Sequence, residues 1–494
     1  MDERHIVSID LGTSKFAIAV AKVEGDNIHI IYYKEHPAHG IRYSRILNPT
    51  QASRELKKGI ETAEQELGIK ITQVIVGMPK YEVRQEAAHM TMERNPEELI
   101  SKEEINNLKE MAIDTYPLAN PEAEVLFGAV AQSFSNGEEF QIVEEEFEGM
   151  AGNQIEGNFK LFIGRASSIR NIDLAFNNIG ICVARKYFTP DSTAKAVLSD
   201  SEMDNGVALI DFGAGVTSLS IYYGNIMRHY AAIPFGGSVI TKDIKSESSI
   251  SETLAENIKL AFGACMPDKL QNMSEKILHI TSSTTSHTKI LPVKYLSEII
   301  TARVREIIEA VLYEIQASGM ADQLKSGIVL TGGCANLANC ANLIKEMSGY
   351  SVRTGYPKKL FSVSGCEGIY ESNAAVSVGM ILTGKQEKNL NCLLPVEKTS
   401  SVEIESEYGQ EPQPEEENTG IQEDDIQNDG TLFGTGGESK DTPEQQPRAK
   451  EPKKPKPPKT PKGVTWVKDK FSSLGNLFGS YYEEISKEID NEQI

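Results

Sequence analysis

The pattern of apolar and polar positions divides the chain of 494 residues into three parts. Up to about residue 386, strand-like alternation is interleaved with helical periodicity, which is typical of an α/β protein of more than one domain. Two stretches of this part, 6–22 and 207–224, share one pattern: an apolar strand, an Asp, a Gly-containing turn and a second alternating strand. We therefore expect two similar hairpins within the folded part.

The stretch 82–167 departs from that order. Its helical segment begins at Ser101, and Glu104 stands where a capping box requires an acidic residue. Alternating apolar positions follow in 124–134 and again in 140–147, which favours strands. This mixture predicts a small α+β insertion.

The composition changes at Glu387. From there to Lys462 the chain is first acidic and rich in Gln and Asn, then basic and rich in Pro. Such segments bury too little apolar surface to offset chain entropy, so 387–462 is interpreted as an unfolded linker.

Apolar positions return at three- and four-residue intervals from Gly463, and they predict an amphipathic helix over 463–490. An aromatic-rich helix beside a basic run suits an anionic membrane surface. A helix that docks on a protein, or a short coiled coil, is the alternative. The residues expected to enter the membrane are Trp466, Val467, Phe471, Leu474, Leu477 and Phe478.

Charge and cysteine content exclude several classes of function. The net charge of −21 argues against non-specific nucleic-acid binding. The six cysteines are scattered and form no CxxC pair, which disfavours a zinc site or a disulfide framework. There is no leader pattern and no run of about 18 apolar residues, so a soluble cytoplasmic protein is the default expectation.

The two hairpin turns carry the groups that bind phosphate. Glycine allows the backbone to approach a phosphate closely, and the hydroxyls of Thr13 and Ser14 can donate to its oxygens. Asp10 and Asp211 would lie at strand ends and hold Mg²⁺ mostly through water, and Lys15 adds a positive charge. Two ordinary β-hairpins are the alternative for either turn taken alone.

Two further segments favour a nucleotide site. A buried strand leads into Gly332 and Gly333 at a helix start, where a flat ring or a phosphate can pack on the backbone. In the helical segment 251–263, Glu256 and Lys259 share a face. Taken alone, that pair is typical of a solvated surface.

These four segments occur in the order found in the actin, heat-shock chaperone and sugar-kinase ATPase superfamily. Over nearly its whole length the chain resembles the bacterial cell-division family FtsA. The resemblance is carried by "SIDLGTSK", "GVALIDFGAGVTSLSIYYG", "IPFGGSVITKDI", "AENIKLAFG", "IITARVREII", "IVLTGGCANL" and the segment "GRASSIRNIDLAFNNIGICVARKYF".

The resemblance implies an α/β, actin-like two-lobed ATPase fold with an inserted α+β subdomain, a disordered linker and a C-terminal amphipathic helix. It assigns 1–81, 168–199 and 369–386 to subdomain 1A, 82–167 to the inserted subdomain 1C, 200–240 and 327–368 to subdomain 2A, and 241–326 to subdomain 2B.

The resemblance also implies ATP and Mg²⁺ in a cleft between the lobes. Asp10 and Asp211 are the expected metal residues. The residues expected at the nucleotide are Asp10, Gly12, Thr13, Ser14, Lys15, Asp211, Gly213, Ala214, Gly215, Thr217, Gly236, Gly237, Glu256, Lys259, Gly332 and Gly333.

The partners that the resemblance implies are the C-terminal peptide of FtsZ, further copies of the chain in filaments, an anionic membrane surface and later division proteins. The peptide is expected on subdomain 2B, at Arg303 and Glu306. From the residues alone, these two would be read as part of a solvated helix face. The implied location is the cytoplasmic face of the membrane at the division septum.

The second turn, "DFGAGVTS", departs from the family pattern. Ala214 replaces a Gly, Val216 a Thr and Ser218 an Asp. Fewer groups then remain to orient the attacking water or the water shell of a metal ion, so ATP binding is better supported than ATP hydrolysis. No catalytic residue is assigned. The alternatives are an actin-like ATPase with real turnover, or a sugar or acetate kinase.

Overall fold

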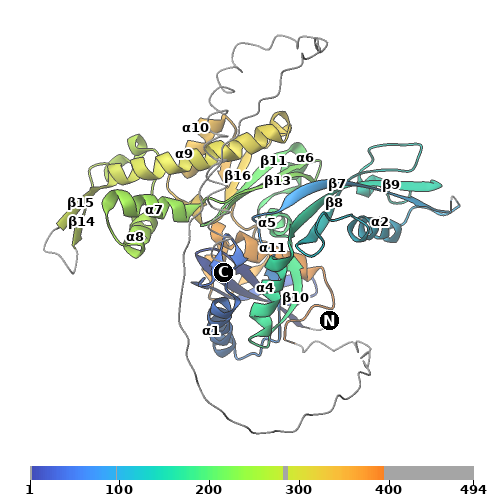
Figure 1. Cartoon of the computed structure of the whole chain (residues 1–494), viewed down its shortest axis with the longest axis horizontal. Helices are drawn as coiled ribbons and strands as arrows, with labels where there is room; N and C mark the ends of the chain where they lie inside the picture. Colours follow the sequence, from blue (N-terminus) through green and yellow to red (C-terminus); the bar gives the residue numbers. More distant parts are fainter. Residues whose placement is uncertain (1–2, 96, 282–287, 394–494) are drawn as a thin grey trace, which may run out of the picture. The chain divides into compact units, whose positions relative to one another are not determined.

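The computed structural model describes residues 3–95, 97–281 and 288–393, which are coloured in Figure 1. The linker and the C-terminal helix expected from the sequence lie, apart from the first residues of the linker, outside the described residues. Among the described residues, every helix is either too short or too polar to span a bilayer.

The first sheet is built around β1, which is buried on both faces. Phe16 and Ile18, on one face of the adjoining strand, pack on Gly59 of α1, whereas Ser8 donates from the other face to the carbonyl oxygen of Ser377 in α11. The helices that pack with this sheet are α1 (Pro49–Leu67), α4 (Ala166–Asn177), α5 (Thr189–Val197) and α11 (Ala375–Lys385). The strand order is β10 (Cys182–Tyr187), β6 (Gln73–Gly77), β1 (Arg4–Leu11), β2 (Lys15–Glu24), β3 (Asn27–Pro37) and β18 (Ser362–Val363).

The second sheet repeats the arrangement of the first. In both sheets three consecutive antiparallel strands are followed, on the side of the first of them, by two parallel strands. The order is β13 (Ile226–Ile233), β12 (Thr217–Tyr223), β11 (Val207–Phe212), β16 (Ile328–Thr331) and β17 (Val352–Thr354). The two hairpins expected from the sequence, β1–β2 and β11–β12, therefore occupy equivalent places.

The remaining elements of the second half pack with or beside this sheet. They are α6 (Asp200–Asn205), α7 (Gly237–Ser248), α8 (Glu252–Phe262), the hairpin β14 (Ile277–Thr281) and β15 (Thr288–Pro292), the long helix α9 (Val293–Ala317) and α10 (Cys340–Ser348). Short 3₁₀ turns cover Pro267–Lys269, Gln271–Met273, Ala321–Gln323, Gly333–Asn336, Glu367–Tyr370 and Ser372–Ala374. A two-stranded ribbon, β4 (Ile41–Arg42) and β5 (Arg45–Ile46), precedes α1.

A third sheet lies within 82–167 and has its own hydrophobic core. Its order is β7 (Arg84–Glu93), β9 (Gln154–Arg165) and β8 (Glu124–Ser135), with α2 (Lys102–Asp114) and α3 (Glu144–Phe147) beside it. The capping box of Ser101 and Glu104 is confirmed, with the Glu104 amide donating to Ser101 Oγ over 3.2 Å. The alternation in 140–147 does not make a strand: only Ile142 forms a bridge, and α3 turns Phe147 into the core to stack on Phe134.

The sheet contacts and burial correct two of the expected boundaries. Ser362 and Val363 pair with β3 of the first sheet, although the sequence placed them with the second. The linker was expected from Glu387, yet Leu390 and Cys392 are buried and the Cys392 amide donates to the carbonyl oxygen of His5 over 2.8 Å. Residues 387–393 therefore belong to the folded part.

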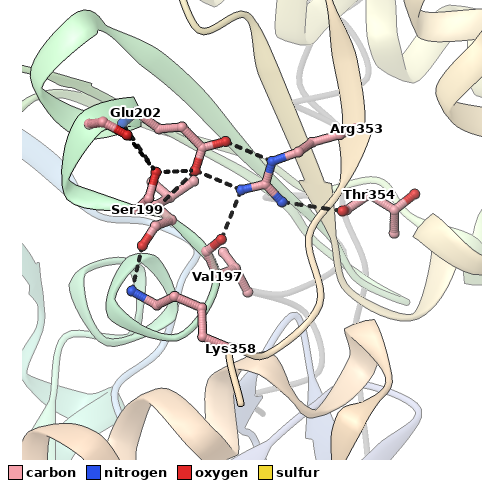
Figure 2. Close-up of polar contacts among 8 residues, drawn as sticks. Val197, Ser199, Glu202, Arg353, Thr354 and Lys358 are labelled. Carbon is pink, nitrogen blue, oxygen red and sulfur yellow. Dashed lines mark hydrogen bonds and ion pairs between the residues drawn. The ribbon is translucent and has the colours of Figure 1, made fainter. Parts of the chain in front are cut away.

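The two segments that connect the first sheet to the second are joined by a polar cluster, shown in Figure 2. Arg353 donates through Nε and Nη2 to both carboxylate oxygens of Glu202, at 2.7 and 2.8 Å, and through Nη2 to the carbonyl oxygen of Val197. Lys358 Nζ donates to the carbonyl oxygen of Leu198 over 2.6 Å. The outgoing and returning segments are thus bound directly to each other.

Candidate functional site

The turn between β1 and β2 forms one wall of a cleft. The amide of Gly12 donates to the carbonyl oxygen of Asp10 over 3.2 Å, and a Cβ added at Gly12 would lie 2.4 Å from the carbonyl oxygen of Lys15. Only glycine fits a turn this tight. The tightness keeps the backbone N–H groups and the side chains of Thr13 and Ser14 at the surface of the cleft.

The turn between β11 and β12 forms the opposite wall. It closes through a hydrogen bond from the Gly213 amide to the carbonyl oxygen of Val216, over 3.0 Å. The first amides of α7 hold it from behind: Gly237 donates to the carbonyl oxygen of Gly213 and Ser238 to that of Ala214. The second turn is therefore fixed by a helix start rather than by its own side chains.

The two turns meet directly. A Cβ added at Gly215 would lie 2.5 Å from Thr13 Oγ1, so the second turn touches the side chain of the first. Between them lies a cavity of about 490 Å³, within the range of small-molecule sites. The predicted residues that line it are Asp10, Gly12, Thr13, Ser14, Lys15, Asp211, Gly213, Ala214, Gly215, Gly237, Glu256, Lys259, Gly332 and Gly333.

Two residues expected at the nucleotide, Thr217 and Gly236, do not line the cavity. Thr217 is fully buried and donates from Oγ1 to the carbonyl oxygen of Phe235 over 2.8 Å. A Cβ at Gly236 would lie 2.3 Å from the carbonyl oxygen of Gly213. Both residues support the second turn from beneath instead of facing the cleft.

Glu256 and Lys259 are not the solvated pair that the isolated helix pattern suggested. The Lys259 side chain is 7% exposed, and Nζ donates to the carbonyl oxygen of Gly237 at 2.9 Å, to Thr241 Oγ1 at 2.8 Å and to Glu256 Oε2 at 2.8 Å. These bonds join α8 to the start of α7. The pair thereby ties this wall of the cleft to the second turn.

Gly332 and Gly333 close the cleft from the side of β16. Gly332 has φ 87°, and a Cβ there would lie 2.5 Å from Asp211 Oδ1, whereas a Cβ on Gly333 would meet nothing within 4 Å. A 3₁₀ turn, Gly333–Asn336, follows directly, and α10 begins only at Cys340, so the helix start is later than expected.

Lys80 also lines the cavity and was not predicted. Its Nζ donates to Asp211 Oδ2 over 2.5 Å, and the two side chains are 13% and 9% exposed. Burial alone would lower the pKa of Lys80, but Asp211 and Asp10 raise it above its usual value. Burial raises the pKa of Asp10, and the Lys80 charge opposes that shift. The lysine is therefore bound to Asp211 and stabilised as a cation by the charges of Asp211 and Asp10.

The position of Lys80 could have been found from the strand pattern. Residues 73–77 form a buried strand, and β6 runs parallel to β1, so its carboxyl end lies beside Asp10. Polar residues just beyond the carboxyl ends of parallel strands commonly face a ligand. Glu35, Asn336 and Ser372 also line the cavity, and no motif of the sequence pointed to them.

A metal would find few protein ligands here. Across the described ranges, no three or more His, Cys, Asp or Glu side chains are grouped as a metal site. Asp10 and Asp211 are oxygen donors of the kind that Mg²⁺ prefers, and Mg²⁺ retains several of its waters. The two carboxyl groups fit Mg²⁺ held through water and phosphate oxygens, not a cage made of protein.

The residues expected at the FtsZ peptide lie on α9, and they are not among the residues that line the cavity. Arg303 Nε donates to Asp243 Oδ2 of α7 and its Nη1 to Glu306 Oε2, both over 2.6 Å. Arg303 therefore links α9 to α7. The residues expected to contact the membrane all lie outside the described residues.

The comparisons with known proteins agree with this geometry. A family model described as "Cell division protein FtsA" matches residues 208–379. The chain is 28% identical over 365 residues to the cell division protein FtsA of Neisseria meningitidis serogroup B, covering 73% of this chain and 86% of the relative. With FtsA of Borreliella burgdorferi it shares 28% over 398 residues, covering 80% and 94% of the two chains.

Among solved structures, the fold resembles a chain of the PilM–PilN type IV pilus biogenesis complex. The TM-score is 0.55 at 15% identity, and the match covers 77% of this chain and 98% of that one. This likeness concerns the fold alone. Together, the family match and the curated relatives show that this chain is similar to the cell division protein FtsA, and its duplicated sheets and paired turns are those of an actin-like ATPase fold.

Proposed function

We propose that this chain is an ATP-binding adaptor of cell division that joins FtsZ filaments to the cytoplasmic membrane. The observation that carries the nucleotide part is the contact between the two turns: Gly215 lies directly against Thr13, and both turns line one cavity of about 490 Å³. A triphosphate between these turns would receive backbone N–H groups from both walls.

Each part of the cleft has a role in this proposal. The turns at Gly12 and Gly213 approach the phosphates, Asp10 and Asp211 hold Mg²⁺ through water, and Gly332 and Gly333 leave room for the adenosine. Bound Mg²⁺ would supply charge neutralisation to the phosphates. Hydrolysis is not part of the proposal, because Val216 and Ser218 replace the hydroxyl and the carboxylate of the family pattern.

The proposed attachment to FtsZ and to the membrane is supported by the similarity to FtsA and by the sequence pattern. We infer that the FtsZ C-terminal peptide docks at Arg303 and Glu306 on α9. We also infer that 463–490 fold as an amphipathic helix at an anionic bilayer, where the chain assembles into filaments and recruits later division proteins at the septum.

Vesicle binding tests the membrane part. The full chain should sediment with anionic liposomes, and a chain lacking 463–494 should remain in the supernatant, because the apolar stripe supplies the affinity. Negative-stain images with Mg-ATP should show filaments on the vesicles. A full chain that stays soluble and releases phosphate steadily would support an actin-like ATPase with turnover instead.

The peptide site is tested separately. Arg303→Glu should weaken binding of an FtsZ tail peptide by roughly tenfold, since reversing one charge in a paired contact removes a charged hydrogen bond. Arg305→Glu is the matched control, because it reverses an exposed charge on the same helix. Equal affinities of the two variants would remove Arg303 from the site.

A further inference from the structure

Three lysines line the cleft, and they differ in what their ammonium groups already bind. Lys259 Nζ has three oxygen partners, which use all of its donors. Lys15 is 46% exposed and bonds to Glu35 over 2.5 Å. Within the described ranges, Lys80 Nζ has one hydrogen-bond partner, Asp211, and it is 13% exposed. Lys80 therefore combines burial with donors that remain available.

The backbone of Lys80 is fixed by the second sheet. Tyr230 of β13, which is 2% exposed, donates from its hydroxyl to the carbonyl oxygen of Lys80 over 2.5 Å. The ring of Tyr230 is held in turn by Phe188 and Phe162, at centroid distances of 5.2 and 6.1 Å. Lys80 is thus held at both ends: Tyr230 binds its backbone carbonyl oxygen, and Asp211 binds its ammonium group.

The acidic side chains of the cleft favour a cation beside Asp211. Asp10, Glu35 and Asp211 line the cavity together with the turns, and a nucleoside triphosphate would bring further negative charge beside them. In a buried site such repulsion is poorly screened. Lys80 already places a positive charge beside Asp211, at a position where a bound metal ion would otherwise supply that charge.

We propose that Lys80 is a resident cation of the nucleotide site. While bonded to Asp211, it donates its remaining N–H groups to phosphate oxygens, so triphosphate binding by this chain depends only weakly on Mg²⁺. This inference rests on the proposed function, because it assumes that the cleft takes ATP. It goes further in naming which residue neutralises the phosphates and how the site responds to metal.

Equilibrium titration with a fluorescent ATP analogue tests this inference on the full chain, once with Mg²⁺ and once with EDTA. The wild-type affinity should change by less than about fivefold between the two buffers. Lys80→Met should lose about tenfold to a hundredfold of affinity in EDTA, which corresponds to one or two charged hydrogen bonds. Lys80→Arg is the matched control, because it retains the positive charge at the same position and should keep most of the affinity.

Several results would overturn the inference. If the wild-type affinity falls more than about fivefold in EDTA, the chain still binds ATP, but Lys80 does not act as the resident cation of the site. Wild-type-like or tighter binding by Lys80→Met in EDTA would show that the Lys80–Asp211 pair is neutral or blocks the site. A wild-type chain that binds no analogue in either buffer would remove both the inference and the proposed ATP site.

Discussion

At the scale of single residues, the carboxyl group of Glu202 reports on the polar cluster of Figure 2. Partial burial would raise its pKa, but Arg353 and the Ser199 amide lower it to about 2, against 4.5 for the unperturbed group. Because the folded pKa is the lower one, this carboxylate contributes stability that is fully present above about pH 4.5. The contribution is lost as the pH falls toward about 2.

Glu202→Gln tests this dependence. The wild type should be more stable than the variant at neutral pH. The difference between their urea midpoints should narrow at about pH 3, because Glu202 is then protonated in the unfolded chain and this protonation competes with the ion pair to Arg353. Urea unfolding curves of both proteins at neutral pH and at about pH 3 measure this difference. A difference that stays constant would mean that the ionised carboxylate adds nothing to stability.

Gly332 and Gly333 make a second test at this scale, since they are adjacent and differ in what a methyl group would meet. Gly332→Ala places Cβ against Asp211 at φ 87° and should destabilise the protein by roughly 1–3 kcal/mol. Gly333→Ala enters open space and should change stability by less than about 0.5 kcal/mol. Equal denaturation midpoints for the two variants would contradict the strained geometry.

At the scale of elements, the inserted sheet docks on the edge strand β13. Gln85 of β7 accepts from the Tyr230 amide at 2.9 Å, and Gln132 of β8 donates to the carbonyl oxygen of Met227 at 3.0 Å. Lys160 of β9 donates to the carbonyl oxygen of Arg228. One residue from each strand of the insertion therefore satisfies the outer edge of the second sheet, which would otherwise offer unpaired groups.

Hydrogen exchange can test this docking. Gln85→Ala removes the acceptor of the Tyr230 amide, so that amide should exchange at least about tenfold faster, the effect of losing about 1.4 kcal/mol of protection. Gln85→Glu keeps an acceptor oxygen and should preserve the slow exchange. Unchanged exchange in Gln85→Ala would mean that β13 is protected without the insertion.

The sequence predicted local elements well and contacts between elements poorly. The two hairpins and the capping box at Ser101 were readable because each depends on a few neighbouring residues. The short helix at Glu144–Phe147 was mistaken for a strand, because its turn is imposed by the stacking of Phe147 on Phe134. Lys80 was missed for a similar reason, since it meets Asp211 only after the two sheets are assembled.

At the scale of the whole molecule, the last described residues, 387–393, are held by contacts with the start of the chain. Arg4 donates to the carbonyl oxygens of Glu387 and Leu390, and Cys392 pairs with His5 and Thr72. These contacts join the end of the described chain to its beginning.

Truncation should reveal this contribution. A chain that ends at Gln386 should be less stable than one that ends at Leu393 by on the order of 4 kcal/mol, because it loses two buried side chains and several backbone hydrogen bonds. Removing only 394–494 should leave the urea midpoint close to that of the full chain. Equal midpoints for the two truncations would show that 387–393 do not stabilise the fold.

The placement of Cys392 also has a mechanical consequence. Its amide bonds to β1 at His5, and its carbonyl oxygen accepts from the amides of Thr72 and Gln73 at the start of β6. β1 and β6 are neighbouring inner strands of the first sheet. If the tail is anchored at a bilayer as proposed, a force on the tail acts on hydrogen bonds to two inner strands at the same time. The force is then distributed over the first sheet.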